Sequence, residues 1–121
     1  MQNSKVEICF IGNAIVDILA KMSNETLNKL KIPKGSMQLI DEDASNKILE
    51  FIQDPSIISG GSAANTAVGF KSFGGKCSFI GQIGNDKFGN LFSKDLNNSG
   101  IFFEFKNFQI TEKTSKSIIL V

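Results

Sequence analysis

A glycine pair, Gly60-Gly61, joins a short β-branched run to an apolar helical pattern that ends at Gly74-Gly75. A strand that turns through two glycines into a helix exposes backbone N–H groups at the helix N-terminus. Such a turn can bind a small molecule that carries hydroxyl or phosphate groups. The pair would also suit a tight turn without any ligand, because glycine adopts the positive φ values that such turns need.

The residues after the glycine pair favour the ligand. Ser62-Ala63-Ala64 keep the first helical turn small, so that a ligand can approach the backbone closely. Asn65 falls one turn into the helix, at a position where a residue facing the core would be apolar. The candidate binding residues of this turn are therefore Gly60, Gly61, Ser62 and Asn65.

Asp17 is a second candidate, in the apolar stretch GNAIVDILA that follows the first expected strand. Its carboxylate either lies on the surface of an alternating strand or points into a cleft as a hydrogen-bond acceptor. In open α/β sheets ligands bind at the carboxyl ends of strands, which is where Gly12, Asn13 and Asp17 fall. An ionised Asp can accept hydrogen bonds from two neighbouring sugar hydroxyls, and Asn13 offers both a donor and an acceptor.

The composition indicates one globular domain and argues against several classes of protein. The chain has 121 residues, of which 41% are hydrophobic and 21% charged, enough for a single core. Its 13 basic residues are all lysine and are spread along the chain, and the net charge is +1, which argues against nucleic-acid binding. No apolar run reaches the roughly 18 residues that a membrane span needs, and no signal peptide is recognisable.

The two cysteines, Cys9 and Cys77, each lie in an apolar run and form no C-x-x-C motif. We expect two buried thiols in a reducing cytoplasm. The chain has no histidine, so a cysteine–histidine nucleophile and a histidine-rich metal site are excluded.

Strands alternate with helices of roughly a dozen residues, which predicts right-handed βαβ units and a parallel sheet covered by helices. Strands are expected over residues 6–11, 56–59, 76–83, 102–105 and 117–121, and helices after Ser23-Asn24, from Asp41 to Ile52, after Gly60-Gly61 and from Asn85-Asp86 to Asn98. Residues 12–40 carry the short runs 15–22 and 36–40 without full crossover helices, so a small accessory sheet or flap is expected there. The chain stops at Val121 inside an apolar strand, which suggests an incomplete fold.

Two common nucleotide-binding motifs are missing. The G-x-G-x-x-G spacing is absent from both candidate turns, Gly12-Asn13-Ala14 and Gly60-Gly61-Ser62, and no Walker A motif occurs. Asp86 follows Asn85 and is interpreted as a helix cap instead of a ribose-binding acid. A nicotinamide-dependent oxidoreductase is therefore not expected.

Several motifs occur in a defined order along nearly the whole chain. They are Gly12-Asn13-x-x-x-Asp17, GGSAANTAVGFKSFGG, FIGQIGNDKFG, Asn98-Ser99-Gly100-Ile101 and Lys113-Thr114-Ser115. This series resembles the N-terminal portion of the ribokinase-like (PfkB) family of carbohydrate and nucleoside kinases. The segment KGSMQLIDE is more similar to the adenosine-kinase-like branch than to ribokinases or fructokinases.

The resemblance implies a large α/β domain with a small β-sheet lid, whose segments would lie approximately within residues 13–40. It implies transfer of the ATP γ-phosphoryl group to the hydroxymethyl group of a sugar or nucleoside. Asp17 would hold ribose hydroxyls, with help from Asn13, Gly60-Gly61 and Asn65 and with Ser62 nearby. Met37 and Leu39 would alternate on one face of a lid strand and cover the acceptor, although ordinary sheet packing explains them equally well.

The sequence also departs from the family. The G-A-G-D motif, which in the family provides the catalytic base and the glycines that bind the developing anion, does not occur in these residues. ATP and Mg²⁺ are implied as cofactors, but the segment that binds them is absent from this chain. We therefore expect residues 1–121 to form a single partial domain, an acceptor-binding portion that is inactive alone and carries no catalytic or metal-binding residue.

Other interpretations remain open from the sequence. The chain could be a non-catalytic module that binds a nucleoside or sugar, or one that dimerises through its lid sheet. Adenosine, another nucleoside, ribose and fructose are all compatible acceptors, because relatives with these substrates share the residues that would hold them.

Overall fold

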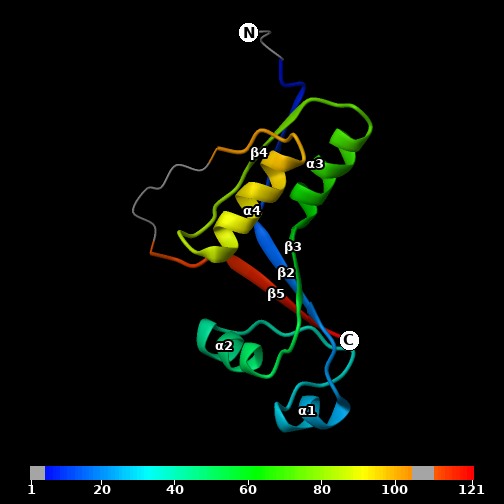
Figure 1. The fold of residues 1–121 in the computed structure, drawn as a ribbon, viewed down its shortest axis with the longest axis vertical. Coiled ribbons are helices and arrows are strands. Elements are labelled where there is room, and N and C mark those ends of the chain that lie inside the picture. Colours follow the sequence, from blue (N-terminus) through cyan, green and yellow to red (C-terminus); the bar gives the residue numbers. More distant parts are fainter. Residues whose placement is uncertain (1–4, 105–110) are drawn as a thin grey trace. The chain divides into compact units, whose positions relative to one another are not determined.

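The computed structural model of the protein describes residues 5–104 and 111–121, and Figure 1 traces them as a ribbon. Its elements in chain order are β1 (Ile8–Ile11), β2 (Ile15–Ala20), α1 (Asn24–Lys29), α2 (Glu42–Glu50), β3 (Ser56–Gly60), α3 (Ser62–Ser72), β4 (Cys77–Ile80), α4 (Lys87–Asn98) and β5 (Ser115–Leu120). None of the described helices is long and apolar enough to cross a membrane. The chain divides into two compact units: Met1–Asp17 with Ile58–Ser117, and Ile18–Ile57 with Ile118–Val121.

The first unit contains a parallel pair of strands, β1 and β4, with Ile8 opposite Cys77 at the start of the register. Phe102 lies along the other edge of β4, where its carbonyl accepts from the Phe79 N–H at 3.0 Å. This pairing confirms the parallel arrangement expected from the sequence. The strand expected over residues 102–105 is reduced to the single bridge between Ser78 and Phe102, and residue 105 falls outside the described residues.

Aromatic side chains join one face of this sheet to helices α3 and α4. The Phe10 ring lies 5.9 Å from that of Phe70 in α3, measured between centroids. Phe79 of β4 lies 5.7 Å from Phe92 of α4 and 5.8 Å from Phe103, and both Phe79 and Phe92 are buried. These ring contacts form part of the core of the first unit.

The two cysteines differ, in contrast to the expectation of two buried thiols. Cys77 is buried and its thiol donates to the Ala67 carbonyl at 3.6 Å, whereas Cys9 is exposed. Burial raises the pKa of the Cys77 thiol, an effect that the positive charge of Lys71 partly offsets. The difference arises because Cys9 lies on the face of β1 opposite to the helices.

A separate three-stranded sheet has the order β3-β2-β5. The expectation that β3 and β5 belong to the parallel sheet with β1 and β4 was wrong. Along β3 exposed residues alternate with half-buried ones up to the buried Gly60, and β5 consists of exposed and half-buried residues without a buried one. That pattern suits a sheet with one face open to water, while strands of a parallel sheet are normally covered on both faces.

In the second unit, the expected caps of both helices are confirmed. The Ser23 hydroxyl accepts from the Thr26 N–H at 3.2 Å before α1, and the Asp41 carboxylate accepts from the Ala44 N–H at 2.8 Å before α2. Such caps satisfy backbone N–H groups that the first helical turn leaves without a partner.

The strand expected over residues 36–40 is not present. This segment follows Pro33 and a turn in which Gly35 has a φ of +74°, and no described strand pairs with it. Met37 is 84% exposed and Leu39 is 95% exposed. An alternating pattern over so few residues forms a strand only where a neighbouring strand supplies hydrogen bonds.

Candidate functional site

The turn after β1 packs directly against the turn between β3 and α3. A Cβ atom on Gly12 would lie 2.6 Å from the Ala63 Cβ, and one on Gly61 would lie 2.6 Å from the Asn13 carbonyl oxygen. Gly61 also has a φ of +93°, in the region that favours glycine. The two segments that the sequence singled out separately are therefore neighbours, and glycines allow their backbones to meet.

The Asp17 carboxylate lies over Gly60. A Cβ atom on the buried Gly60 would lie 2.7 Å from Asp17 Cγ and 3.1 Å from its Oδ1. Asp17 is only half-buried, and its carboxylate accepts no hydrogen bond from residues 5–104 or 111–121. Its oxygens thus keep their capacity to accept hydrogen bonds from a bound molecule.

Helix α3 begins beside the Asp17 carboxylate, and no side chain caps the backbone N–H groups of its first turn. Its N-cap residue, Gly61, provides no side-chain cap, and its first turn carries no acidic residue. The first helical hydrogen bond runs from the Asn65 N–H to the Gly61 carbonyl at 2.9 Å, and Asn65 is exposed. The N-terminal N–H groups of such a helix point outward and carry a partial positive charge.

Five predicted residues therefore lie in two adjoining segments, the turn after β1 and the passage from β3 into the first turn of α3. They are Asn13, Gly60, Gly61, Ser62 and Asn65, and Asp17 lies against Gly60. A carboxylate that accepts hydrogen bonds beside N–H groups that donate them is suited to a molecule with neighbouring hydroxyls. Met37 and Leu39 belong to the second unit, and their lid role stays a prediction.

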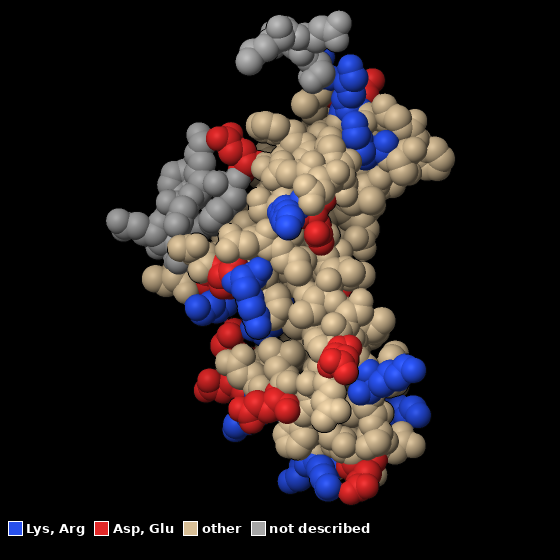
Figure 2. Space-filling view, in the orientation of Figure 1, with Lys and Arg blue, Asp and Glu red and all other residues tan. Residues whose placement is uncertain are grey.

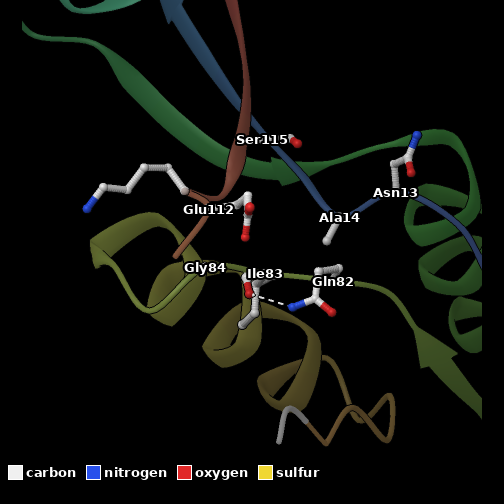
Figure 3. Close-up of a pocket in the computed structure, with 8 residues that line it drawn as sticks. Asn13, Ala14, Gln82, Ile83, Gly84, Glu112 and Ser115 are labelled. Atoms are coloured by element: carbon white, nitrogen blue, oxygen red, sulfur yellow. Dashed lines mark hydrogen bonds between the residues drawn. The ribbon is translucent and has the colours of Figure 1, made fainter. Parts of the chain in front are cut away.

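A pocket of about 160 Å³ opens next to Asn13 in the first unit (Figure 3). It is lined by Asn13, Ala14, Gln82, Ile83, Gly84, Glu112, Lys113 and Ser115. The close-up shows that these residues come from the β1–β2 turn, the segment after β4 and the start of β5. The pocket is smaller than the ~300 Å³ typical of complete ligand sites. Of its lining, only Asn13 was named from the sequence as a candidate binding residue, although Gln82, Ile83 and Gly84 lie in the motif FIGQIGNDKFG and Lys113 and Ser115 lie in Lys113-Thr114-Ser115.

Hydrogen bonds of Asp86 and Thr114 connect the segment after β4 to the segment before β5, and both segments line this pocket. Asp86 Oδ1 accepts from the Gly89 N–H and from the Thr114 hydroxyl, and Oδ2 accepts from the Thr114 N–H, each at 2.8 Å. The Thr114 hydroxyl oxygen in turn accepts from the Gly84 N–H at 2.9 Å. The predicted role of Asp86 as the cap of α4 is confirmed, and its link to Thr114 is an addition that only the structure shows.

Burial by itself would raise the pKa of the Asp86 carboxyl. The hydrogen bonds from the Thr114 N–H, the Gly89 N–H and the Thr114 hydroxyl outweigh that effect and hold this pKa below its ordinary value. Asp86 therefore stays ionised at neutral pH and acts as a fixed acceptor within the structure.

Charges of both signs are interspersed on the face of the molecule drawn in Figure 2, in blue and red. Among the described residues, no three His, Cys, Asp or Glu side chains lie close enough to hold a metal ion. The candidate site therefore depends on Asp17 and the two adjoining segments, and not on a cluster of metal-ligating side chains among the described residues.

Solved kinase structures share this fold. A probable sugar kinase from Rhizobium etli CFN 42 is 33% identical with a TM-score of 0.77, and the match covers 93% of this chain and 34% of that chain. Adenosine kinase from Sinorhizobium meliloti is 34% identical with a TM-score of 0.78, and its match covers 98% of this chain and 36% of that chain. The fold is therefore the ribokinase-like α/β fold expected from the sequence.

Curated relatives are fructokinases. Probable fructokinase-4 of Arabidopsis thaliana is 32% identical over 69 residues, which are 57% of this chain and 20% of the relative. Fructokinase of Escherichia coli is 35% identical over 60 residues, 50% of this chain and 20% of the relative. The family described as pfkB family carbohydrate kinase matches residues 35–121. This chain belongs to the pfkB family of carbohydrate kinases, and it spans about a fifth of the length of these curated relatives.

Proposed function

We propose that this chain forms the acceptor-binding part of an ATP-dependent kinase that phosphorylates the hydroxymethyl group of a nucleoside or sugar. The observation that carries the proposal is the Asp17 carboxylate, which lies against Gly60 beside the uncapped start of α3. Membership of the pfkB family supports the type of reaction.

Within this proposal, Asp17 accepts hydrogen bonds from two neighbouring hydroxyls of the acceptor. Asn13 and Asn65 contribute amide groups, and the backbone at Gly61 and Ser62 allows a close approach. Phosphoryl transfer depends mostly on positioning and electrostatic stabilisation, so holding the secondary hydroxyls would orient the reacting hydroxymethyl group.

ATP and Mg²⁺ are the cofactors that the family implies. The described residues offer no cluster of metal-ligating side chains, and the G-A-G-D motif is absent from the sequence. The described residues therefore do not form a binding site for ATP or Mg²⁺. We infer that a further part of the kinase holds ATP and Mg²⁺, and that this chain alone transfers no phosphate.

The acceptor we favour is adenosine or a related ribosyl compound. The KGSMQLIDE segment and the adenosine kinases among similar structures support it, while the curated relatives are fructokinases. A thermal-shift and turnover panel of adenosine, other nucleosides, ribose and fructose on the complete kinase separates these acceptors. Preference for fructose would contradict the choice of adenosine and leave the role of Asp17 intact.

The decisive variant is Asp17→Asn in the kinase that carries this sequence. We expect kcat/KM for the acceptor to fall about 100-fold or more, because removing a charged acceptor of hydrogen bonds costs roughly 1.5–3 kcal/mol for each bond. The KM for ATP should change little. Asp43→Asn, at an exposed position in the first turn of α2, is the matched control and should retain full activity.

An unchanged kcat/KM in Asp17→Asn would remove Asp17 from the site. Acceptor binding without any ATP-dependent turnover by the complete protein would favour a non-catalytic binding module instead. The cytoplasmic location and a homodimer through the lid sheet stay predictions.

A further inference from the structure

Helix α4 (Figure 1) contacts the strand that leads into the candidate site through one carboxylate. The Ser59 N–H of β3 donates to Asp95 Oδ2 of α4 at 3.3 Å, between residues 36 positions apart in the sequence. Both residues are half-buried and both belong to the first unit. Because Ser59 directly precedes Gly60-Gly61, this hydrogen bond holds the chain at the last residue before the glycine pair.

The Ser59 N–H belongs to an edge strand. β3 is an outer strand of the β3-β2-β5 sheet, and no other strand of the described residues pairs with its second side. An edge strand leaves N–H groups without a partner strand. The Asp95 carboxylate provides an acceptor for one such group, and no lysine of residues 5–104 or 111–121 forms an ion pair with this carboxylate.

Local helix energetics do not explain an aspartate at position 95. α4 ends at Asn98, so Asp95 lies in its last turn. A negative charge in the last turn interacts unfavourably with the helix dipole, and aspartate is a weak helix former. The hydrogen bond from Ser59 is therefore the contact in the structure that gives the Asp95 carboxylate a role.

The core of the first unit fixes the position of Asp95. Its neighbours on α4, Phe92 and Leu96, are both buried, and the Phe92 ring lies 5.7 Å from the Phe79 ring of β4. The first turn of α4 is held by its cap, Asp86. Asp95 is thus a fixed point to which the end of β3 is attached.

The contact between Gly60 and Asp17 leaves little room for a shift of β3. A Cβ atom on Gly60 would lie 2.7 Å from Asp17 Cγ, so the backbone at Gly60 passes directly beside the carboxylate. β3 also pairs with β2, the strand that carries Asp17. A displacement of Ser59 would therefore move the backbone against which the Asp17 carboxylate lies.

We propose that Asp95 is a positioning residue of the acceptor site, which acts through the Ser59 N–H on Gly60 and so sets the place of the Asp17 carboxylate. The inference rests on the proposed function and deepens it, since it adds a residue of α4 to the two adjoining segments. Its effect on the acceptor substrate is indirect. Because a misplaced Asp17 would misalign the reacting hydroxymethyl group, loss of Asp95 should lower kcat as well as raise KM for the acceptor substrate.

The test compares Asp95→Ala with Asp95→Asn in the complete kinase. Alanine removes the partner of the Ser59 N–H, and we expect kcat/KM for the acceptor substrate to fall about tenfold, with the KM for ATP unchanged. Asparagine keeps an oxygen that accepts a hydrogen bond and should restore most of the activity. Asn90→Ala, at an exposed position of the same helix, is the matched control and should retain full activity.

Hydrogen exchange of single amides in the complete kinase gives a readout that does not depend on activity. The Ser59 amide should exchange about tenfold faster in Asp95→Ala than in the unsubstituted protein, because β3 loses a contact that opposes local opening. The Phe79 amide, which donates to the Phe102 carbonyl, is the internal control and should exchange at the same rate in both proteins. Equal rates at Ser59 would overturn the proposal.

The double variant of Asp95→Ala and Asp17→Asn tests the route of the effect. If Asp95 acts through Asp17, its activity should lie within about twofold of Asp17→Asn alone, whereas independent effects would multiply and overturn the proposal. An unchanged kcat/KM in Asp17→Asn would overturn the proposed function and this inference with it. Loss of activity in Asp17→Asn but not in Asp95→Ala would overturn this inference alone.

Discussion

Gly60 is a position where a single methyl group should alter the candidate site. A Cβ atom there would collide with the Asp17 carboxylate, whose Cγ lies 2.7 Å from the Cβ position. We expect Gly60→Ala to displace Asp17 and to weaken acceptor use about tenfold or more, with a loss of roughly 1–3 kcal/mol in stability from overpacking. Acceptor kinetics and thermal unfolding of the complete kinase measure the two effects.

Gly69→Ala is the control for this prediction. Gly69 lies within α3, and a Cβ atom there would meet nothing within 4 Å. Alanine should stabilise the helix by roughly 0.5–1 kcal/mol and leave acceptor kinetics unchanged. Equal effects of the two substitutions would mean that the contact between Gly60 and Asp17 does not matter for binding.

The lowered pKa of Asp86 supports a prediction of how the stability of the fold depends on pH. Its folded pKa lies below the ordinary value, so its ionised form stabilises the fold fully above the unfolded pKa of about 3.9. This contribution is lost as the pH falls through the folded pKa. Asp86→Asn should therefore cost stability near pH 7, by roughly 1–3 kcal/mol from the weakened cap and the Thr114 hydrogen bonds.

The measurement is the free energy of unfolding of the unsubstituted protein and of the Asp86→Asn variant, between neutral and strongly acidic pH. The difference between the two proteins is expected to shrink as acid protonates the Asp86 carboxylate. A difference that stays constant over this range would show that the charge of Asp86 is not what stabilises the turn.

At the scale of elements, α3 depends on the backbone geometry at Gly61. This residue combines a φ of +93° with a close approach to the Asn13 carbonyl. Gly61→Ala should cost more than the roughly 1–3 kcal/mol expected from a strained φ alone. Gly74 has a similar φ of +91°, but nothing lies within 4 Å of its Cβ position. The stability lost in Gly74→Ala therefore measures the strain of the positive φ without a steric contact.

Unfolding by denaturant compares the two variants. If Gly61→Ala and Gly74→Ala lose the same stability, the contact between the two turns contributes nothing. A larger loss in Gly61→Ala supports the view that this contact joins the turn after β1 to the start of α3.

The elements also show where the local sequence pattern was sufficient to predict the structure and where it was not. Ser23, Asp41 and Asp86 were recognisable as helix caps, because a cap is satisfied by N–H groups only two or three residues away. The strand assignment of residues 36–40 was wrong, since a strand needs a partner that the local sequence does not specify.

At the scale of the whole molecule, we predict that the 121-residue chain alone does not phosphorylate an acceptor. The sequence has no G-A-G-D motif, and the chain spans about a third of the kinases of known structure that it resembles. A coupled assay of ADP release with adenosine, ribose and fructose provides the measurement. Turnover that is abolished in Asp17→Asn would refute the prediction and assign catalysis to this chain.

The sequence by itself determined the family motifs and the helix caps, and it predicted the residues of the candidate site. These features depend on residue type and short spacing, which are visible in a single chain. Only the tertiary structure decided that β3 and β5 pair with β2, that the Asp17 carboxylate lies on Gly60, and that Thr114 binds Asp86. Each of these joins residues far apart in the chain, and such contacts are chosen by packing of the whole fold and not by any local pattern.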